Sequence, residues 1–215
     1  MKKIICIALV AISSIIHAQS MMPKLATDIS TLLIGEKIPN TTLKSSENKD
    51  IILLDLFKKK KTILVFYRGG WCPYCNAHLS ALAEAEKQLL DLGYQIIAIS
   101  SDSSNNLKIT EEKDKLNYLL LSDSKGELAK AMGIVFEAPE NYKLILNVHS
   151  NGGNKLFLPV PSVFILNKEG EIQFEYIAPD FKYRTAVSTA SLNSESLRLF
   201  KTTRSAMTPT FAVHL

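Results

Sequence analysis

The chain has 215 residues, of which 47% are hydrophobic, and its net charge at pH 7 is +4. This length and composition suit one globular domain with a buried core and short tails. The basic residues are dispersed apart from the run at 58–61, which lacks interleaved aromatic residues and a second basic cluster. The charge pattern therefore argues against nucleic-acid binding.

The N-terminus has the layout of a secretory signal peptide. Two lysines precede an apolar run at 4–16, and small residues at Ala18 and Ser20 offer cleavage sites. The run is short for a membrane span, although an uncleaved anchor is the alternative. We therefore expect residues 1–18 to be a signal peptide that leaves with Cys6, and the mature protein to be exported to the periplasm.

The predicted elements alternate between strands and helices. After a tether at 19–34, the domain is expected to cover 35–200, followed by a tail at 201–215. Segment 51–57 mixes strand and short-helix signals. Continuous β-branched and apolar runs predict strands at 62–67, 94–100, 118–121, 162–166 and 171–177. Apolar residues at helical spacing predict helices at 76–92, 107–116, 127–132 and 186–200.

This alternation predicts an α/β fold with a parallel sheet and crossover helices. The last two strands, joined by the turn at 167–170, should form a hairpin at the antiparallel edge of the sheet. The long irregular stretch at 134–158 predicts an inserted hairpin or lid. Pro161 directly precedes the hairpin, and we expect a cis peptide at Val160–Pro161 that faces the cysteines; a trans proline at the strand start is the alternative.

Cys72 and Cys75 lie between the first buried strand and the helix that follows it. The unpaired amides and the dipole at a helix N-terminus favour a thiolate, which is the reactive form of cysteine. Pro73 suits the first helical turn because it lacks an amide hydrogen. Arg68, four residues before Cys72, adds a positive charge near the sulfur. The pair is therefore predicted to be redox active.

Three other roles for the pair are less favoured. A zinc site would recruit His78 and His149, but no second cysteine pair completes a four-ligand set. Haem attachment needs a histidine directly after the second cysteine, where Asn76 stands. A structural disulfide with a two-residue spacer restrains little of the unfolded chain. We expect no metal and no cofactor beyond the redox-active Cys72–Cys75 disulfide.

Together these features resemble the thioredoxin-like superfamily over residues 35–184. Segment 66–75, Phe-Tyr-Arg-Gly-Gly-Trp-Cys-Pro-Tyr-Cys, resembles the signature of the peroxiredoxin-like branch of the alkyl hydroperoxide reductase and thiol-specific antioxidant (AhpC/TSA) family. Segments 98–100, 121–123 and 179–184 agree with that branch. The resemblance implies a thioredoxin-like fold with a central mixed β-sheet flanked by helices and an inserted segment before the cis-proline strand.

The resemblance leaves the roles of the two cysteines open. In the thioredoxin pattern Cys72 attacks and Cys75 resolves, whereas alignment with peroxiredoxins through Tyr67 puts Cys75 at the peroxidatic position and Cys72 at that of a threonine. Arg68 stands where peroxiredoxins have a proline. Phe66 stands where thioredoxin keeps a buried aspartate, so proton transfer to Cys75 needs another group or water.

We therefore predict an exported thiol-disulfide redox enzyme, an oxidoreductase with an antioxidant or disulfide-reducing role. One alternative is a thiol peroxidase that reduces hydrogen peroxide or organic hydroperoxides with Cys75 or Cys72 as the peroxidatic cysteine. The other is a non-catalytic binding module on the same scaffold. The expected partners are a thiol or disulfide protein reductant or a peroxide, with a homodimer also considered and no nucleic acid.

Seven further residues are expected to support the site. Trp71, Tyr74 and Pro161 would shape a docking groove for a disulfide substrate. If the protein is a peroxidase, Arg68 or Arg184 would stabilise the leaving oxygen. Tyr67 and Pro73 complete the set of supporting residues.

Overall fold

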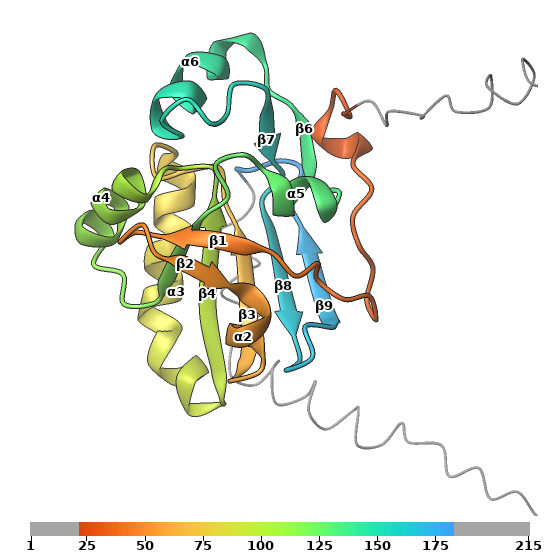
Figure 1. Cartoon of the computed structure of the whole chain (residues 1–215), viewed down its shortest axis with the longest axis vertical. Helices are drawn as coiled ribbons and strands as arrows, with labels where there is room; N and C mark the ends of the chain where they lie inside the picture. Colours follow the sequence, from red (N-terminus) through yellow and green to blue (C-terminus); the bar gives the residue numbers. More distant parts are fainter. Residues whose placement is uncertain (1–21, 183–215) are drawn as a thin grey trace, which may run out of the picture.

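The computed structural model describes residues 22–182 (Figure 1). The expected signal peptide, the expected helix at 186–200 and Arg184 lie outside the described residues. The main sheet contains β1 (Thr42–Ser45), β2 (Asp50–Ile52), β3 (Lys61–Phe66), β4 (Tyr94–Ser100), β5 (Leu119–Ser122), β8 (Ser162–Leu166) and β9 (Ile172–Ile177). A separate pair is formed by β6 (Val135–Glu137) and β7 (Phe157–Pro159). The helices are η1 (Ala26–Asp28, a 3₁₀ turn), α2 (Leu53–Phe57), α3 (Pro73–Asp91), α4 (Ser104–Asp114), α5 (Glu127–Ala131) and α6 (Glu140–His149).

The main sheet is mixed, with strand order β2-β1-β5-β4-β3-β8-β9. The central strands β3, β4 and β5 run parallel, and β8 pairs antiparallel with β3 before turning into β9. This confirms the predicted parallel centre and the predicted antiparallel hairpin at one edge. The other edge, where β1 pairs antiparallel with both β5 and β2, was not predicted.

Strand β3 lies in the middle of the core because both of its faces are apolar. Its residues from Thr62 to Phe66 are at most 1% exposed. Ile63 and Val65 pack with the apolar faces of α3 and α4, whereas Leu64 packs with α2 and α5 on the opposite face. Helices therefore cover both faces of the sheet, as expected for a thioredoxin-like fold.

The insert, residues 134–158, is a hairpin that carries a helix. Strands β6 and β7 pair antiparallel, and α6 lies between them in the chain. Asn154 closes the hairpin: its side-chain amide donates to the Phe157 carbonyl at 2.9 Å and its Oδ1 accepts from the Leu156 amide at 3.0 Å. The expected inserted hairpin is confirmed, whereas helix α6 was not predicted. In Figure 1, α6 lies beyond one end of the central strands.

The expected cis peptide at Val160–Pro161 is wrong, because residues 22–182 contain no cis peptide bond. The Val160 amide donates to the Ile134 carbonyl at 2.7 Å, and the Pro161 carbonyl accepts from the Ala178 amide at 2.8 Å. The extended backbone thus runs directly from the insert into β8. Pro161 precedes the first paired residue of the strand, where its missing amide breaks no ladder bond.

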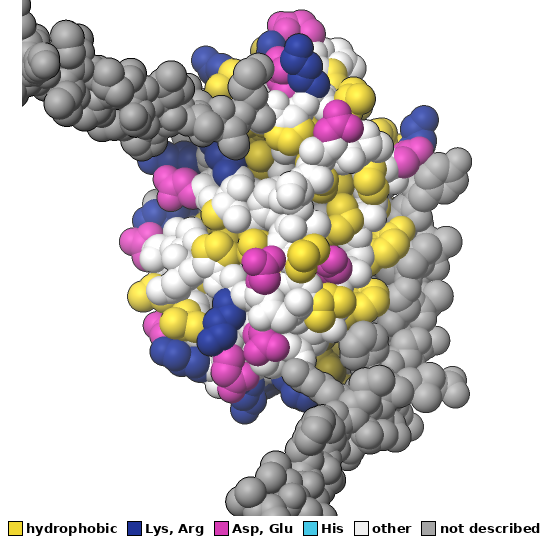
Figure 2. Space-filling model, turned by 90° about the vertical axis from the view of Figure 1, so that its right-hand side faces the viewer, with side chains coloured by type: hydrophobic (Ala, Val, Ile, Leu, Met, Phe, Trp, Pro, Cys, Tyr) yellow, Lys and Arg dark blue, Asp and Glu magenta, His cyan; other side chains and the backbone are white. Residues whose placement is uncertain are grey.

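The charged side chains are interspersed on the face seen in Figure 2. Acidic and basic groups of the described residues alternate there, with hydrophobic side chains between them. Between residues 22 and 182, no helix has both the length and the apolar character needed to cross a membrane.

Candidate active site

The two cysteines lie at the carboxyl end of β3. The cysteine loop, residues 67–72, connects β3 to α3, and β3 runs parallel to its neighbour β4. Cys72 is the N-cap of α3, Pro73 is its first residue and Cys75 lies in its first turn. This confirms the predicted strand-loop-helix placement of the pair. It also puts both sulfurs at the end of the helix where unpaired amides favour negative charge.

Both cysteines are buried thiols. Cys72 is 2% exposed and Cys75 is fully buried. The backbone carbonyl of Cys72 accepts hydrogen bonds from the amides of Cys75, at 3.0 Å, and Asn76, at 3.1 Å. The Asn76 side chain donates to the Gly70 carbonyl at 2.9 Å, which ties the first turn of α3 back to the cysteine loop. The pair is therefore held on a short and well-bonded segment.

Two glycines in the cysteine loop have no room for a side chain. Gly69 has a φ angle of +147°, and a Cβ atom there would collide with the Trp71 indole and lie 2.8 Å from Asp102 Oδ1. A Cβ atom on Gly70 would overlap the hydroxyl of Thr110 on α4. The glycines thus allow the loop to pass directly against α4 and Asp102.

Arg68 is a buried cation that is surrounded by aromatic rings. It is 4% exposed, and within residues 22–182 it forms no salt bridge. Its Cζ lies 4.1 Å from the ring centre of Phe181, 4.4 Å from that of Tyr142 and 5.0 Å from that of Trp71. Each such contact contributes about 0.5–2 kcal/mol, with the larger value for desolvated pairs. Because Tyr142 belongs to α6, Arg68 fastens the insert to the cysteine loop.

Asp102 is a buried carboxyl group that sequence reasoning missed. It follows β4 and is fully buried, and its Oδ2 accepts a hydrogen bond from the Gly70 amide at 2.7 Å. Burial raises the pKa of Asp102 to about 6, and the hydrogen bonds from Gly70 and Ser100 oppose that rise. Its position could have revealed it, since the carboxyl ends of neighbouring parallel strands meet at one edge of the sheet.

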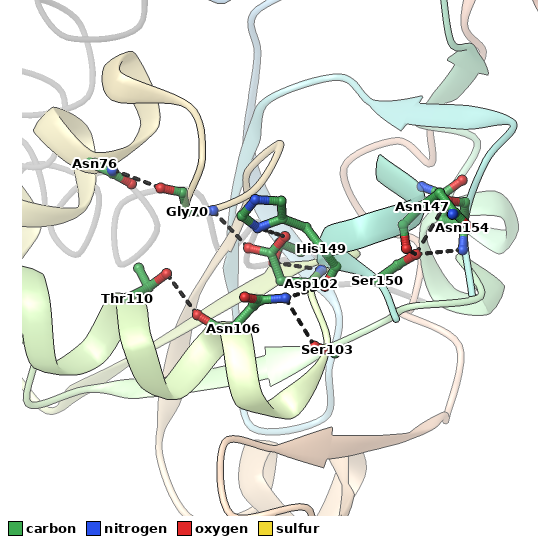
Figure 3. A network of polar contacts seen from close by, with 11 residues as sticks. Gly70, Asn76, Asp102, Ser103, Asn106, Thr110, Asn147, His149, Ser150 and Asn154 are labelled. Carbon is green, nitrogen blue, oxygen red and sulfur yellow. Dashed lines mark hydrogen bonds and ion pairs between the residues drawn. The ribbon is translucent and has the colours of Figure 1, made fainter. Parts of the chain in front are cut away.

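Helix α6 ends beside this carboxyl group (Figure 3). His149, its last residue, places Nδ1 3.9 Å from Asp102 Oδ1, and burial lowers the pKa of His149. The carbonyl of His149 accepts hydrogen bonds from the Ser103 amide and the Asn106 side chain, both at 2.8 Å. The insert is thus attached to the start of α4 as well as to the cysteine loop.

The remaining predicted residues lie around the same end of the sheet. Tyr67 is fully buried, and burial, followed by the nearby charges of Asp102 and Cys75, raises its pKa. Pro161 is buried. The residue after it, Ser162, pairs with Phe66, the last residue before the cysteine loop, so Pro161 lies beside that loop. Tyr74, by contrast, is 43% exposed.

The residues considered for zinc binding do not form a ligand set. His78 is buried on α3, whereas His149 lies at the end of α6. In the described part of the chain, no three histidine, cysteine or acidic side chains converge in the manner of a metal site.

Comparison with known proteins identifies the family. The model of the AhpC/TSA family matches residues 34–175. Peroxiredoxin bcp1 from Schizosaccharomyces pombe is 31% identical over 115 residues, which cover 54% of this chain and 58% of that protein. The chloroplastic peroxiredoxin Q from Suaeda salsa is 30% identical over 124 residues, covering 55% and 58%. The chain thus spans somewhat more than half the length of these relatives.

A solved structure shows the same fold. The crystal structure of peroxidoxin BcpB from Mycobacterium tuberculosis has a TM-score of 0.63 at 16% identity, covering 79% of this chain and 96% of that chain. This likeness confirms the expected thioredoxin-like fold. The family match and the relatives named peroxiredoxins confirm the expected enzyme class, an oxidoreductase. On the family match, the chain belongs to the AhpC/TSA family, in its peroxiredoxin branch.

Proposed function

We propose that this protein is a thiol peroxidase of the peroxiredoxin type, in which Cys72 and Cys75 reduce hydrogen peroxide or an organic hydroperoxide. The observation that carries the proposal is the placement of both thiols at the N-terminus of α3 in a chain of the AhpC/TSA family. The printed names of the relatives, peroxiredoxin bcp1 and peroxiredoxin Q, support it. The peroxidase thus replaces disulfide reduction as the leading reading.

The proposed cycle uses the two thiols in turn. One thiol gives up its proton, and the thiolate attacks the terminal peroxide oxygen. The O–O bond breaks, the sulfur becomes a sulfenic acid, and the departing oxygen takes up that proton and leaves as water or an alcohol. The second thiol then displaces the hydroxyl group, which leaves as water, and an S–S bond forms. An external dithiol, which is itself oxidised to a disulfide, returns the pair to thiols by exchange.

Arg68 is the residue best placed to support the charge in this cycle. It lies in the cysteine loop and carries a buried positive charge that no carboxylate in residues 22–182 neutralises. A cation in a site of low dielectric favours a thiolate and the developing negative charge on the departing oxygen. Arg184, the other predicted candidate, lies outside the described residues.

A second candidate function is thiol-disulfide exchange. Cys72 and Cys75 are separated by two residues at the start of α3, and the amide of Cys75 donates to the carbonyl of Cys72 at 3.0 Å. A pair of cysteines with a two-residue spacer is the arrangement found in disulfide oxidoreductases. This arrangement equally serves an enzyme whose substrate is a disulfide rather than a peroxide.

The experiment measures peroxide consumption and insulin disulfide reduction for the wild type, Cys72→Ser and Cys75→Ser. We expect peroxide turnover by the wild type and a stoichiometric single reaction by the variant that keeps the attacking cysteine, which assigns that role. Disulfide reduction without any peroxide consumption would favour thiol-disulfide exchange. A wild type that is inactive in both assays would contradict both proposals and favour a binding module.

Export and the partners are further proposals. The charged and apolar pattern of residues 1–18 supports a signal peptide and a periplasmic location. N-terminal sequencing of protein purified from a cell fraction tests this, since a mature chain that begins at Met1 would contradict it. The proposed reductant is a thiol protein, and a homodimer can be checked by light scattering.

A further inference from the structure

Asp102 lies where three parts of the molecule meet (Figure 3). Its backbone follows β4, its Oδ2 accepts the Gly70 amide of the cysteine loop at 2.7 Å, and its Oδ1 lies 3.9 Å from Nδ1 of His149 on the insert. It is fully buried, and Oδ1 accepts no hydrogen bond within residues 22–182. A buried carboxyl oxygen with no donor costs stability, which makes Asp102 a candidate for a functional role.

The cysteine loop is built around this carboxyl group. Only a glycine fits at position 69, because a Cβ atom would come within 2.8 Å of Asp102 Oδ1 and would collide with Trp71. The Gly70 carbonyl, on the residue whose amide Asp102 holds, accepts the hydrogen bond from Asn76 in the first turn of α3. Two hydrogen bonds therefore connect Asp102 to the helical turn that contains Cys75.

Asp102 and Cys75 share a buried neighbour, Tyr67. Burial raises the pKa of the Tyr67 phenol most, and the nearby charges of Asp102 and Cys75 raise it further. From the insert, the titratable group that faces Asp102 is His149, and from the cysteine loop it is Tyr67. Ser100 on β4 contributes only an uncharged hydroxyl. The nearby cation, Arg68, is stacked on aromatic rings rather than paired with Asp102. Within residues 22–182, neither Arg68 nor any lysine forms a salt bridge with Asp102.

We propose that Asp102 is a positioning residue for the cysteine pair, which holds the cysteine loop through the Gly70 amide and sets the reactivity of the thiols through its protonation state. A carboxylate disfavours a nearby thiolate, whereas a neutral carboxylic acid does not. The inference rests on the proposed function of the pair, because it assigns a role to a neighbour of the same two thiols.

The test measures thiol reactivity directly and needs no substrate. Iodoacetamide alkylation rates are followed from about pH 5 to about pH 8.5 in the Cys72→Ser and Cys75→Ser backgrounds, each with and without Asp102→Asn. The asparagine keeps the shape and can still accept the Gly70 amide, but it carries no charge. Asp123→Asn is the matched control. Asp123 also follows a parallel strand, is 5% exposed and accepts backbone amides, but those amides belong to α5.

We expect the logarithm of the wild-type rate to change slope near the pKa of Asp102, about 6. In Asp102→Asn that change should disappear, and the rate at neutral pH should rise by about threefold or more, the effect of removing one nearby like charge. Asp123→Asn should retain the wild-type profile. A structural role alone would alter stability without moving the profile.

Two results would overturn the proposal. One is a pH profile of the alkylation rate that shows no change of slope in either single-cysteine background while Asp102 is intact. This result decides the question even where Asp102→Asn does not fold. The other is a profile of Asp102→Asn that coincides with those of the wild type and Asp123→Asn. Peroxide turnover is scored separately. A shifted alkylation profile without peroxide turnover would therefore refute the proposed function while the role of Asp102 stands.

Discussion

The contact between Gly70 and Thr110 permits a sharp test of the packing that positions the cysteine loop. The φ angle of Gly70 is not positive, so alanine is compatible with its backbone. The cost of Gly70→Ala therefore comes from the steric contact of the added Cβ alone. The added Cβ overlaps the Thr110 hydroxyl and lies 3.1 Å and 3.3 Å from Thr110 Cβ and Cγ2. The hydroxyl donates to the Asn106 carbonyl at 3.0 Å, so turning it away breaks that bond.

The expected magnitude follows from two terms. Overpacking of a tight site costs about 1–3 kcal/mol, and a lost buried hydrogen bond adds about 1 kcal/mol. Gly70→Ala should therefore lower the free energy of unfolding by about 2–4 kcal/mol. In the double variant with Thr110→Ala, the hydroxyl and the methyl group are gone, so we expect about 1–2 kcal/mol of this cost to be recovered.

The assay is urea unfolding followed by the fluorescence of Trp71, the single tryptophan of the chain. Gly93→Ala provides a contrast, because Gly93 has a φ angle of +84° and open space around its would-be Cβ. Its cost is backbone strain, which Thr110→Ala should leave unchanged. Strict additivity of Gly70→Ala and Thr110→Ala would refute the assignment of the cost to their contact.

Three further predictions address the insert, the carboxyl group of Asp102 and the core. Tyr142→Ala removes a ring that lies 4.4 Å from the Arg68 guanidinium. Amide hydrogen exchange should become faster in α6 and stay unchanged in β3. Equal protection of α6 in the wild type and in Tyr142→Ala would contradict the role of Arg68 in fastening the insert. For Asp102, the folded-state pKa of about 6 lies above the model value of 3.8. Its contribution to stability is therefore complete below about pH 4 and is lost as the pH rises through about 6, by up to about 3 kcal/mol. Asp102→Asn lacks this loss, so the urea midpoints of the wild type and the variant should converge or cross between these pH values, and parallel curves would exclude it. Tyr118 donates its hydroxyl to the Leu79 carbonyl at 2.8 Å; Tyr118→Phe should cost about 1–2 kcal/mol in unfolding free energy by leaving that group less satisfied, and an unchanged midpoint would show that the bond contributes nothing net.

Elements with a strong local pattern were predictable from the sequence. The run that forms β3 is apolar on both faces, and such a run fits only a central, doubly covered strand. Helix α3 places Leu79, Leu82 and Leu89 on one buried face and begins at Pro73. The spacing of its apolar residues and the proline in its first turn made it predictable. The turn that joins β8 and β9 was equally clear from Asn167 and Gly170.

Elements with a weak local pattern were missed. Strand β1 has only four residues, and two of them are exposed. Helix α6 buries only Leu146 and leaves Leu144 and Val148 exposed, so it lacks the apolar face that reveals a helix. The same limit explains the wrong cis assignment at Pro161, because the backbone there is set by hydrogen bonds to Ile134 and Ala178 that come from distant segments.

The Cys72–Cys75 pair was predictable as a candidate redox site, because a thiol at a strand-to-helix junction lies where the backbone amides favour a thiolate. The residues that surround the pair depend on tertiary contacts. Asp102 comes from the next strand, Tyr142 from the insert and Phe181 from the segment after β9. None of these contacts is set by neighbours in the chain. They arise because parallel strands bring their carboxyl ends to one edge of the sheet, and the insert folds over that edge.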